Sequence, residues 1–517
     1  MFSKSKLLVM TEKNQKGFFW DFYSKLIILV YCLLQMMHWP ILPQFMDVYY
    51  HLLTAWGFIR AGGYSGWDFW QYAPAGRIHI YPPVFHLILA LLIKLGINRI
   101  ILAKLFELLM PVIFLIVLWY FIRKNYSERL AFFVMLTFSS SFPFYSSLLN
   151  HIPASLTLVF GFLALDQLVQ NRILRPLAFL TLCFYTHISV SWLFALCIVL
   201  YGIFNRQYRK TGFLVFISAI LLSLPILYKQ FIGLKFVSFL EIPERNLCEL
   251  KTVDYLLAFF GLGIIFKMPR QYRLFLSLFL ASFIFLIYPY RFFSSQGYLP
   301  IIFLSAISLD FIYEKLQYKK LRLKYIFFLL IGYIVFFSPT MLMEIGNRKP
   351  DVRFKAYLFD SALTNTIFPD WHKRISSTSL WYPDSYLPAV EVIKCNSSQD
   401  DIIFSNIPVA GVILASISGR ATANALFPEI GSSKKFDPIS VSKIIVFPKD
   451  NYYQYRYLID NYNLIKIGES KLFILYKNPF CQAKADIKKA SVSFYTIALI
   501  SSIFMILFLI SKNYLTC

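Results

Sequence analysis

Residues 100–122 read IILAKLFELLMPVIFLIVLWYFI, and the basic pair Arg123-Lys124 follows them directly. A bilayer core about 30 Å thick is crossed by about 20 apolar residues in a helix, because a helix rises about 1.5 Å per residue. This stretch therefore predicts a transmembrane helix that ends at a charged membrane surface.

Comparable apolar windows occur along most of the chain. Those long enough to cross a bilayer, or nearly so, are residues 20–43, 100–122, 130–149, 152–170, 173–187, 188–204, 211–228, 252–267, 273–289, 297–314, 325–343 and 491–511. We expect 173–204 to be a hairpin, because Pro176 and the polar pair Thr186-His187 interrupt it. The shorter stretch 84–97 predicts an interfacial or re-entrant segment. The sequence thus predicts a mainly α-helical, polytopic transmembrane bundle of about 12 spans, possibly 13.

The composition agrees with such a bundle. Of the 517 residues, 58% are hydrophobic and 19% aromatic, but only 15% are charged, whereas a typical soluble domain has about 25% charged residues. A chain with so few charges has too little polar surface to face water everywhere, so lipid must cover much of it. The seven cysteines form no C-x-x-C pair, which argues against a zinc knuckle and a disulfide framework.

The formal net charge of +24 alone would also fit a nucleic-acid-binding protein, but its distribution does not. If residue 1 is cytoplasmic, most lysines and arginines fall in the predicted inside loops, which are 1–19, 123–129, 171–175, 205–210, 267–273 and 315–324. That asymmetry is the positive-inside pattern of membrane proteins. A nucleic-acid binder would instead cluster its charge on one soluble face. We therefore expect an integral membrane protein with a cytoplasmic N-terminus and no nucleic-acid partner.

Two longer polar segments are then predicted on the extracytoplasmic side, 44–83 and 344–490. Short buried strands are predicted in the second segment at DIIFS (401–405), KIIVFP (443–448) and KLFILY (471–476). Helices are predicted between them at 385–395 and 451–461. The expected domains are a transmembrane domain 1–343 with the external loop 44–83, a small extracytoplasmic α/β domain 344–490, and a C-terminal anchor 491–517.

The first external segment has the densest set of chemically useful side chains, DVYYHLLTAWGFIRAGGYSGWDFWQYAPAGRIHIYPPVFH (47–86). Asp47 follows a predicted transmembrane helix directly, and His51 would share its face of a helix four residues on. A carboxylate at the membrane surface can act as a base, or it can hold a divalent cation that bridges phosphate oxygens. The alternative is a solvated helix cap, since aspartate is a common N-cap residue.

Four short motifs divide this segment: Asp47-x-Tyr-Tyr-His51-Leu, Gly-x-x-x-x-Trp67-Asp68-x-Trp70, Ala73-Pro74-x-Gly76-Arg77 and Tyr81-Pro82-Pro83. Together they resemble the first external loop of the GT-C glycosyltransferases, which are multi-pass enzymes that take sugars from polyprenyl-phosphate donors. The likeness is greatest to the catalytic subunit of oligosaccharyltransferase. It implies that Asp47 contributes to a divalent-metal and acceptor site, and that His51 and Tyr81 bind substrate.

Two later residues fit the same resemblance. Glu241, in Ser238-Phe-Leu-Glu241, is similar to the glutamate of the family's Ser/Thr-x-x-Glu element, which works near the acceptor and the metal; a capping box is the alternative. Arg291, in Tyr-Pro-Tyr-Arg291-Phe, is similar to the family's arginine that binds donor phosphate. A guanidinium can grip a phosphate with two hydrogen bonds, and the alternative role is snorkelling at a helix end.

The chain departs from the family in two places. Residues 139–152 read SSSFPFYSSLLNHI and hold no carboxylate where the second acidic motif belongs. Asn150 and His151 could supply metal ligands there, with a buried, hydrogen-bonded histidine as the alternative. Asn406-Ile-Pro-Val-Ala-Gly411 stands where the sequon-reading Trp-Trp-Asp-Tyr-Gly motif should follow Phe404-Ser405. Protein N-glycosylation is therefore not implied for this chain.

These features predict an integral membrane glycosyltransferase that moves a sugar from a polyprenyl-phosphate or diphosphate donor to an extracytoplasmic glycan, lipid or protein. The resemblance implies that Asp47 and Glu241 hold a divalent cation, Mg or Mn, or deprotonate the acceptor. It implies that Arg291 neutralises the departing phosphate, which would help the transition state most. The competing hypothesis is a non-enzymatic GT-C-like scaffold or a lipid-carrier transporter; no internal repeat of the kind common in transporters is visible in the sequence.

Overall fold

The computed structural model describes residues 4–43, 47–141, 148, 152–238, 244–316, 321–346, 351–359, 383–450, 452–494 and 496–497. The chain divides into two compact units that alternate along the sequence. The first unit comprises Met1–His38, Leu108–Ser223 and Pro243–Trp371, and the second comprises Trp39–Glu107, Leu224–Ile242 and His372–Cys517.

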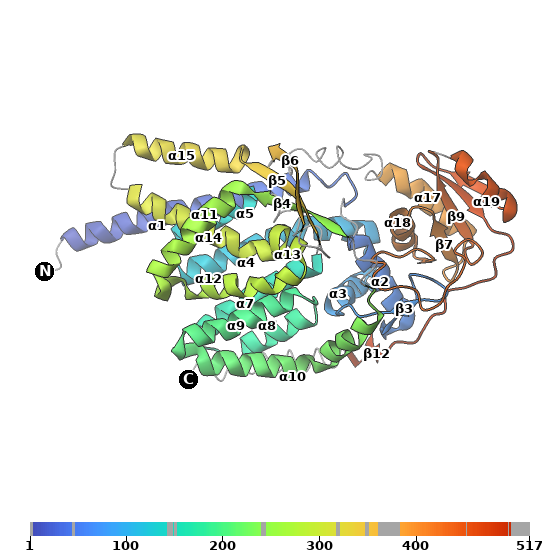
Figure 1. The fold of residues 1–517 in the computed structure, drawn as a ribbon, viewed down its shortest axis with the longest axis horizontal. Helices are drawn as coiled ribbons and strands as arrows, with labels where there is room; N and C mark the ends of the chain where they lie inside the picture. Colours follow the sequence, from blue (N-terminus) through green and yellow to red (C-terminus); the bar gives the residue numbers. More distant parts are fainter. Residues whose placement is uncertain are drawn as a thin grey trace. The chain divides into compact units, whose positions relative to one another are not determined.

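Helices make up most of the first unit (Figure 1). The helices that lie wholly or largely in the first unit are α1 (Lys4–Met36), α4 (Arg99–Asn125), α5 (Glu128–Ser140), α7 (Ile152–Val169), α8 (Leu174–Phe184), α9 (Val190–Phe204), α10 (Arg209–Gly233), α11 (Thr252–Lys267), α12 (Pro269–Ser282), α14 (Leu299–Leu316) and α15 (Leu321–Phe336). The strongest pairings are α11 with α14, α12 with α9, α7 with α8, and α1 with α5. The prediction of a mainly helical chain is confirmed, and so is the break between α8 and α9 in the expected hairpin.

Four helical segments of the described chain are long and apolar enough to cross a membrane: Phe19–Met36, Arg99–Asn125, Ile152–Val169 and Arg206–Phe236. The last of these includes α10, which carries an exposed apolar stripe at Leu214, Ile217, Leu221 and Leu224. A helical stripe of this spacing that stays exposed among the described residues is typical of a surface facing lipid. The number of spans and the orientation of the termini remain predictions.

A three-stranded antiparallel sheet completes the first unit, in the order β4 (Arg245–Lys251), β5 (Pro339–Gly346) and β6 (Val352–Phe359). The sequence analysis missed it, because 325–343 was predicted as one membrane span. The helix α15 instead ends at Phe336, since Pro339 disfavours helical backbone in the residue before it. The expected domain boundary at residue 343 falls inside β5, and the domain division remains a prediction.

Lys251, the last residue of β4, fastens this sheet to the helices. Its side chain is fully buried, and its ammonium donates to the Ser140 carbonyl at 2.9 Å, the Ser140 hydroxyl at 3.3 Å and the Ile334 carbonyl at 2.7 Å. A buried ammonium persists only where such acceptors replace water. The sheet is therefore held at the ends of α5 and α15.

The second unit contains a five-stranded sheet in the order β10 (Ile465–Glu469), β11 (Phe473–Lys477), β9 (Ile444–Pro448), β7 (Ile402–Ser405) and β8 (Ala421–Thr422). Strands β8, β7 and β9 are parallel, whereas β11 pairs antiparallel with β9 and with β10. Buried side chains on one side form a core that includes Ile445, Phe447 and Tyr476. The predicted strands at 401–405, 443–448 and 471–476 are confirmed as β7, β9 and β11.

Helices accompany this sheet (Figure 1): α17 (Pro383–Asn396), α18 (Pro408–Ser418) and α19 (Arg456–Asn461). The expected helices at 385–395 and 451–461 correspond to α17 and to a 3-10 turn followed by α19. The helix α18 begins with Pro408 in its first turn and ends at Gly419, whose φ of 71° is left-handed. Proline at the start and glycine after the end are the usual limits of a helix.

The first external segment also folds into the second unit, as α2 (Asp47–Ala61), β1 (Gly63–Tyr64), β2 (Trp67–Asp68), β3 (Arg77–Ile78) and α3 (Val84–Lys94). The helix α2 packs against α3 and α18. Strand β1 pairs with β12 (Val492–Ser493), so the first residues of the predicted C-terminal anchor 491–517 form a strand and not the start of a helix. This segment is therefore an integral part of the α/β body of the second unit.

Candidate active site

Asp47 is the first residue of α2, and its side chain is half-buried. A carboxylate in the first turn of a helix is favoured by the partial positive charge of the free backbone amides there. The eleven residues from Val48 to Phe58 are all buried. The position of Asp47 is therefore set by a helix that is packed on every side.

His51 lies one turn after Asp47 and is 2% exposed. Its Nδ1 atom is 2.8 Å from Nε2 of His86, whose Nδ1 is 3.2 Å from the Pro82 carbonyl oxygen. Because a carbonyl only accepts, Nδ1 of His86 donates, its Nε2 accepts, and Nδ1 of His51 donates. The chain of hydrogen bonds thus fixes the neutral Nδ1–H tautomer of His86 and places a proton on Nδ1 of His51.

Tyr81, the second predicted substrate-binding residue of this segment, lies beside the same histidine. The ring centroids of Tyr81 and His51 are 5.3 Å apart, and those of Tyr81 and Tyr50 are 6.2 Å apart. The ring of Phe427 also stands edge-on to Tyr50, with the two centroids 5.2 Å apart. His51 and Tyr81 therefore lie in one aromatic cluster with Tyr50, and Asp47 begins the helix that carries His51 and Tyr50. The roles of Asp47, His51 and Tyr81 remain predictions.

A buried ion pair joins this cluster to the sheet. The guanidinium Nε of Arg77 donates to Asp68 Oδ2 at 3.0 Å, and the two side chains are 4% and 1% exposed. Asp68 also accepts from the backbone and side-chain amides of Gln71, both at 3.0 Å. Burial raises the pKa of Asp68, and the Arg77 charge and these hydrogen bonds oppose that rise.

The remaining donors of Arg77 bind the loop that follows β8. They reach the carbonyl oxygens of Leu426 at 2.9 Å, and of Phe427 and Ile430 at 2.8 Å each. The sequence did not predict this role, since Asp68 and Arg77 entered only as members of two motifs and were given no function of their own. The available signal was an arginine nine residues after an aspartate in a loop of otherwise aromatic character.

Of the remaining predicted site residues, the structure describes Arg291. Arg291 belongs to α13 (Pro289–Ser294) in the first unit, where its Nη1 donates to Gln296 Oε1 at 2.9 Å. Glu241 falls outside the described residues, as do Asn150 and His151. The expected convergence of Asp47, Glu241 and Arg291 on one cavity therefore remains a prediction.

The described residues do not by themselves fit a divalent cation. No group of three or more histidine, cysteine, aspartate or glutamate side chains in the described ranges is arranged to hold a metal ion. His51 and His86 direct nitrogens at each other, so these atoms are engaged in a hydrogen bond. Asp47 is one carboxylate, whereas Mg²⁺ needs near-octahedral oxygen coordination. We therefore assign no step to a metal.

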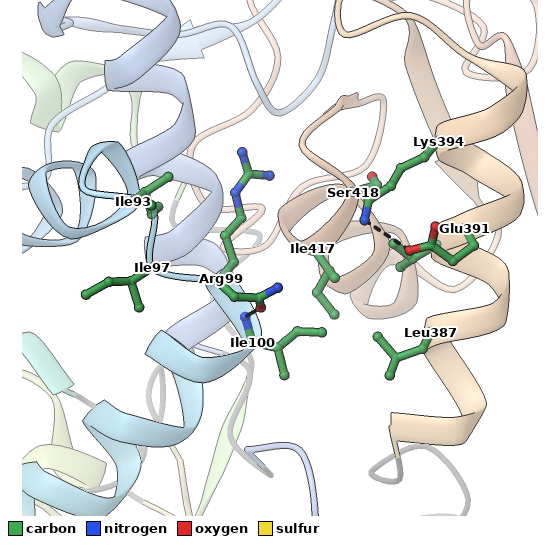
Figure 2. Close-up of a pocket in the computed structure, with 12 residues that line it drawn as sticks. Ile93, Ile97, Arg99, Ile100, Leu387, Glu391, Lys394, Ile417 and Ser418 are labelled. Carbon is green, nitrogen blue, oxygen red and sulfur yellow. Dashed lines mark hydrogen bonds and ion pairs between the residues drawn. The ribbon is translucent and has the colours of Figure 1, made fainter.

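A hollow of about 360 Å³ opens between the α3–α4 connection, α17 and the end of α18 (Figure 2). Its charged side chains are engaged within the protein: Lys394 donates to Glu391 Oε1 at 3.1 Å, and Arg99 donates to the Ser416 carbonyl at 3.0 Å. Of the predicted site residues that the structure describes, none lines it. We therefore do not place the chemistry in this hollow.

His79, directly after β3, is a buried histidine of this region. Its ring is 2% exposed, packs edge-on against Phe58 and near Trp70, and its Nε2 has no hydrogen-bond partner within the described chain. Burial above all, then the nearby charge of Lys229, lowers the pKa of His79 well below its usual value.

The neutral His79 predicts loss of stability in acid. Below about pH 6.5 the unfolded chain takes up a proton that the folded chain resists, so the free energy of unfolding falls by up to about 1.4 kcal/mol per pH unit. In His79→Phe this contribution is absent, and its unfolding temperature should drop less than that of the wild type between about pH 7 and about pH 5. Thermal unfolding in detergent, followed by intrinsic fluorescence, measures both. Parallel pH curves for the two proteins would contradict the prediction.

The sequence matches no protein-family model, and no curated protein matches it. The fold, in contrast, is similar to solved structures. The oligosaccharyltransferase of Archaeoglobus fulgidus in complex with Zn and sulfate aligns with a TM-score of 0.52 at 11% identity, covering 84% of this chain and 69% of that chain. The archaeal oligosaccharyltransferase AglB from Archaeoglobus fulgidus, in complex with an inhibitory peptide and a dolichol-phosphate, aligns with a TM-score of 0.52 at 11% identity over 82% and 69% of the two chains.

A bacterial structure gives a weaker match. ArnT from Cupriavidus metallidurans bound to undecaprenyl phosphate aligns with a TM-score of 0.43 at 12% identity, covering 86% of this chain and 99% of that chain. On the stronger, archaeal matches, the chain has a GT-C-like fold, as the resemblance of its first external loop implies. At these identities the likeness concerns the fold.

Proposed function

We propose that this chain is an integral membrane glycosyltransferase of the GT-C type. It transfers a sugar from a polyprenyl-phosphate or diphosphate carrier to an acceptor on the extracytoplasmic side, with the N-terminus in the cytoplasm. The observation that carries the proposal is the placement of Asp47, half-buried at the start of a fully packed helix beside His51 and Tyr81. The likeness to AglB, whose solved complex holds a dolichol-phosphate and an inhibitory peptide, supports it.

The proposed reaction is a direct displacement at the anomeric carbon of the sugar. Asp47 takes the proton of the acceptor while the acceptor atom bonds to that carbon, and the bond from the carbon to the phosphate oxygen breaks. The phosphate leaves as an anion, and Arg291 stabilises its charge with charge-assisted hydrogen bonds. Glu241 is proposed as a second carboxylate near the acceptor.

The test is transfer of radiolabelled sugar from polyprenyl-linked donors by the purified protein in lipid nanodiscs, over a panel of glycan, lipid and peptide acceptors. The competing proposal, a scaffold without catalysis, draws support from the missing carboxylate in 139–152 and the missing Trp-Trp-Asp-Tyr-Gly motif. An active wild type whose transfer depends on Asp47 rules out the scaffold.

Arg291 provides a prediction about donor binding. Replacing it by alanine removes hydrogen bonds to the donor phosphate, so the affinity for polyprenyl phosphate should fall roughly 10- to 100-fold. Binding of fluorescent polyprenyl phosphate to the protein in nanodiscs measures this. The matched control is Arg353→Ala, which removes an arginine that is 60% exposed from β6 of the same unit. Equal affinities for the two variants would remove Arg291 from the donor site.

A further inference from the structure

Phe427 has a backbone conformation that its sequence disfavours. It lies in the loop after β8 with φ of +60°, in the left-handed region. A bulky residue rarely occupies that region, and Pro428 follows it, which restricts the backbone of Phe427 toward extended conformations. Such strain persists only where surrounding contacts enforce it, and it tends to accompany functional sites.

The contacts that enforce it come from the first external segment. Arg77 binds the carbonyl oxygens of Leu426, Phe427 and Ile430, as described above, and the backbone amide of Leu426 donates to Gln71 Oε1 at 2.9 Å. Arg77 is itself balanced by the buried carboxylate of Asp68. The strained residue is therefore held on both sides by hydrogen bonds from one buried cluster.

Two further contacts tie the same loop down. Ser433 donates from its backbone amide to the Gly76 carbonyl and from its hydroxyl to the Ala75 carbonyl, both at 2.9 Å. The backbone amide of Ser238 donates to the Glu429 carbonyl at 2.6 Å, so the segment that leads toward Glu241 reaches this loop as well. Hydrogen bonds from the first external segment and from Ser238 therefore hold the loop at both Glu429 and Ser433.

The side chain that this backbone presents is an exposed aromatic ring. Phe427 is 40% exposed, whereas its edge-on neighbour Tyr50 is 5% exposed. Tyr50 lies one turn after Asp47 on α2, close enough for the Asp47 charge to raise the pKa of Tyr50 further, after burial and Asp68. Among the rings of the aromatic cluster, Phe427 is therefore one that solvent reaches, and it packs against the helix of Asp47 through Tyr50.

We propose that Phe427 is a platform on which a pyranose ring stacks, next to Asp47. The axial C–H bonds of a pyranose make one face apolar, and a flat aromatic ring covers that face while leaving the hydroxyls in water. The inference rests on the proposed function and adds to it a residue that binds sugar. The sugar is either the one carried by the lipid donor or one in a glycan acceptor, and the two sources are separable by experiment.

The central variant is Phe427→Gly. Glycine adopts φ of +60° without strain, so this variant loses the ring while the loop conformation stays allowed, and a single cooperative unfolding transition checks that the protein is still folded. Phe427→Tyr keeps the ring and should behave as wild type. The matched control is Phe480→Gly, which removes a ring that is 72% exposed from the same unit.

The probes are dolichyl phosphate mannose, dolichyl phosphate glucose, bare dolichyl phosphate, and soluble manno- and gluco-oligosaccharides, each titrated against the full-length protein in nanodiscs. If the platform holds the donor sugar, Phe427→Gly should bind a sugar-loaded lipid at least about tenfold more weakly and bare dolichyl phosphate unchanged. If it holds an acceptor sugar, the loss of similar size appears with the oligosaccharides instead.

Either pattern supports the platform, provided that Phe427→Tyr and Phe480→Gly bind as wild type does. The platform is overturned if Phe427→Gly binds every probe as wild type does, or if wild type prefers no sugar-bearing probe over bare lipid. The proposed function fails separately: sugar binding that depends on Phe427 without transfer by the wild type would keep the platform and reject the enzyme. Sugar transfer that depends on Asp47 but not on Phe427 would keep the proposed enzyme and reject the platform.

Discussion

Asp47→Asn is expected to lower sugar transfer by about 100- to 10,000-fold, the usual contribution of a positioned general base. Asparagine has nearly the shape of aspartate and still caps a helix well, so α2 should remain folded. What it lacks is the negative charge that takes the acceptor proton. The measurement is initial transfer rate from the best radiolabelled donor and acceptor found for the wild type.

The control for Asp47 is Glu391→Gln, another loss of one carboxylate in the second unit. Glu391 is 65% exposed on α17 and pairs with Lys394, and such surface pairs contribute about 0–1 kcal/mol. The sugar-transfer rate of Glu391→Gln should match that of the wild type. If Asp47→Asn transfers sugar at the wild-type rate and unfolds at the wild-type temperature, Asp47 has no part in the chemistry. The hypothesis of a scaffold without catalysis would then be favoured.

The helical part of the fold was readable because apolar length and charge determine where a helix can cross lipid. The window 252–267 coincides with α11, and 152–170 with α7 to within one residue. Apolar length wrongly predicted one membrane span over 325–343. The start of β5 is also apolar there, and this strand pairs with β4, almost 90 residues away in sequence. A strand whose partners are so distant cannot be recognised from the composition of its own segment.

The candidate site could be predicted from the sequence only where it depends on residues close together in the chain. The spacing of Asp47 and His51 predicted one helix face, and α2 contains both. The hydrogen-bond partners in this region are distant in sequence. His86 lies 35 residues from its partner His51, and Phe427, whose carbonyl binds Arg77, lies 350 residues from that arginine. Such contacts depend on how the first external segment folds onto the α/β sheet. Glu241 and Arg291 were chosen by motif alone, and both remain untested.

The ion pair of Asp68 and Arg77 gives the largest expected loss of stability. Asp68→Leu leaves the Arg77 guanidinium buried without its counter-ion, and Arg77→Leu leaves the Asp68 carboxylate in the same state. Removing one partner of a buried pair costs about 3–5 kcal/mol. Each single variant should therefore unfold at a much lower temperature or denaturant concentration than the wild type.

The double variant separates the pair from its surroundings. Asp68→Leu/Arg77→Leu leaves no uncompensated charge, so its loss should be smaller than the sum of the two single losses by about 2 kcal/mol or more. Unfolding in detergent by a denaturant, followed by fluorescence, measures all three. The matched comparison is the exposed ion pair of Arg60 and Asp400, which also joins α2 to the α/β body and is 27% and 46% exposed. Alanine at Arg60 should cost only about 0.2–1 kcal/mol.

Burial, rather than the presence of an ion pair, is what distinguishes the two contacts. If Asp68→Leu costs no more than Arg60→Ala, then Arg77 is solvated in the protein and does not hold the loop of Leu426 to Ile430. If the two leucine substitutions are simply additive, the charges act independently. The expected result is strong coupling at Asp68 and Arg77 together with a small effect at Arg60, because only the buried pair has no water to replace a missing partner.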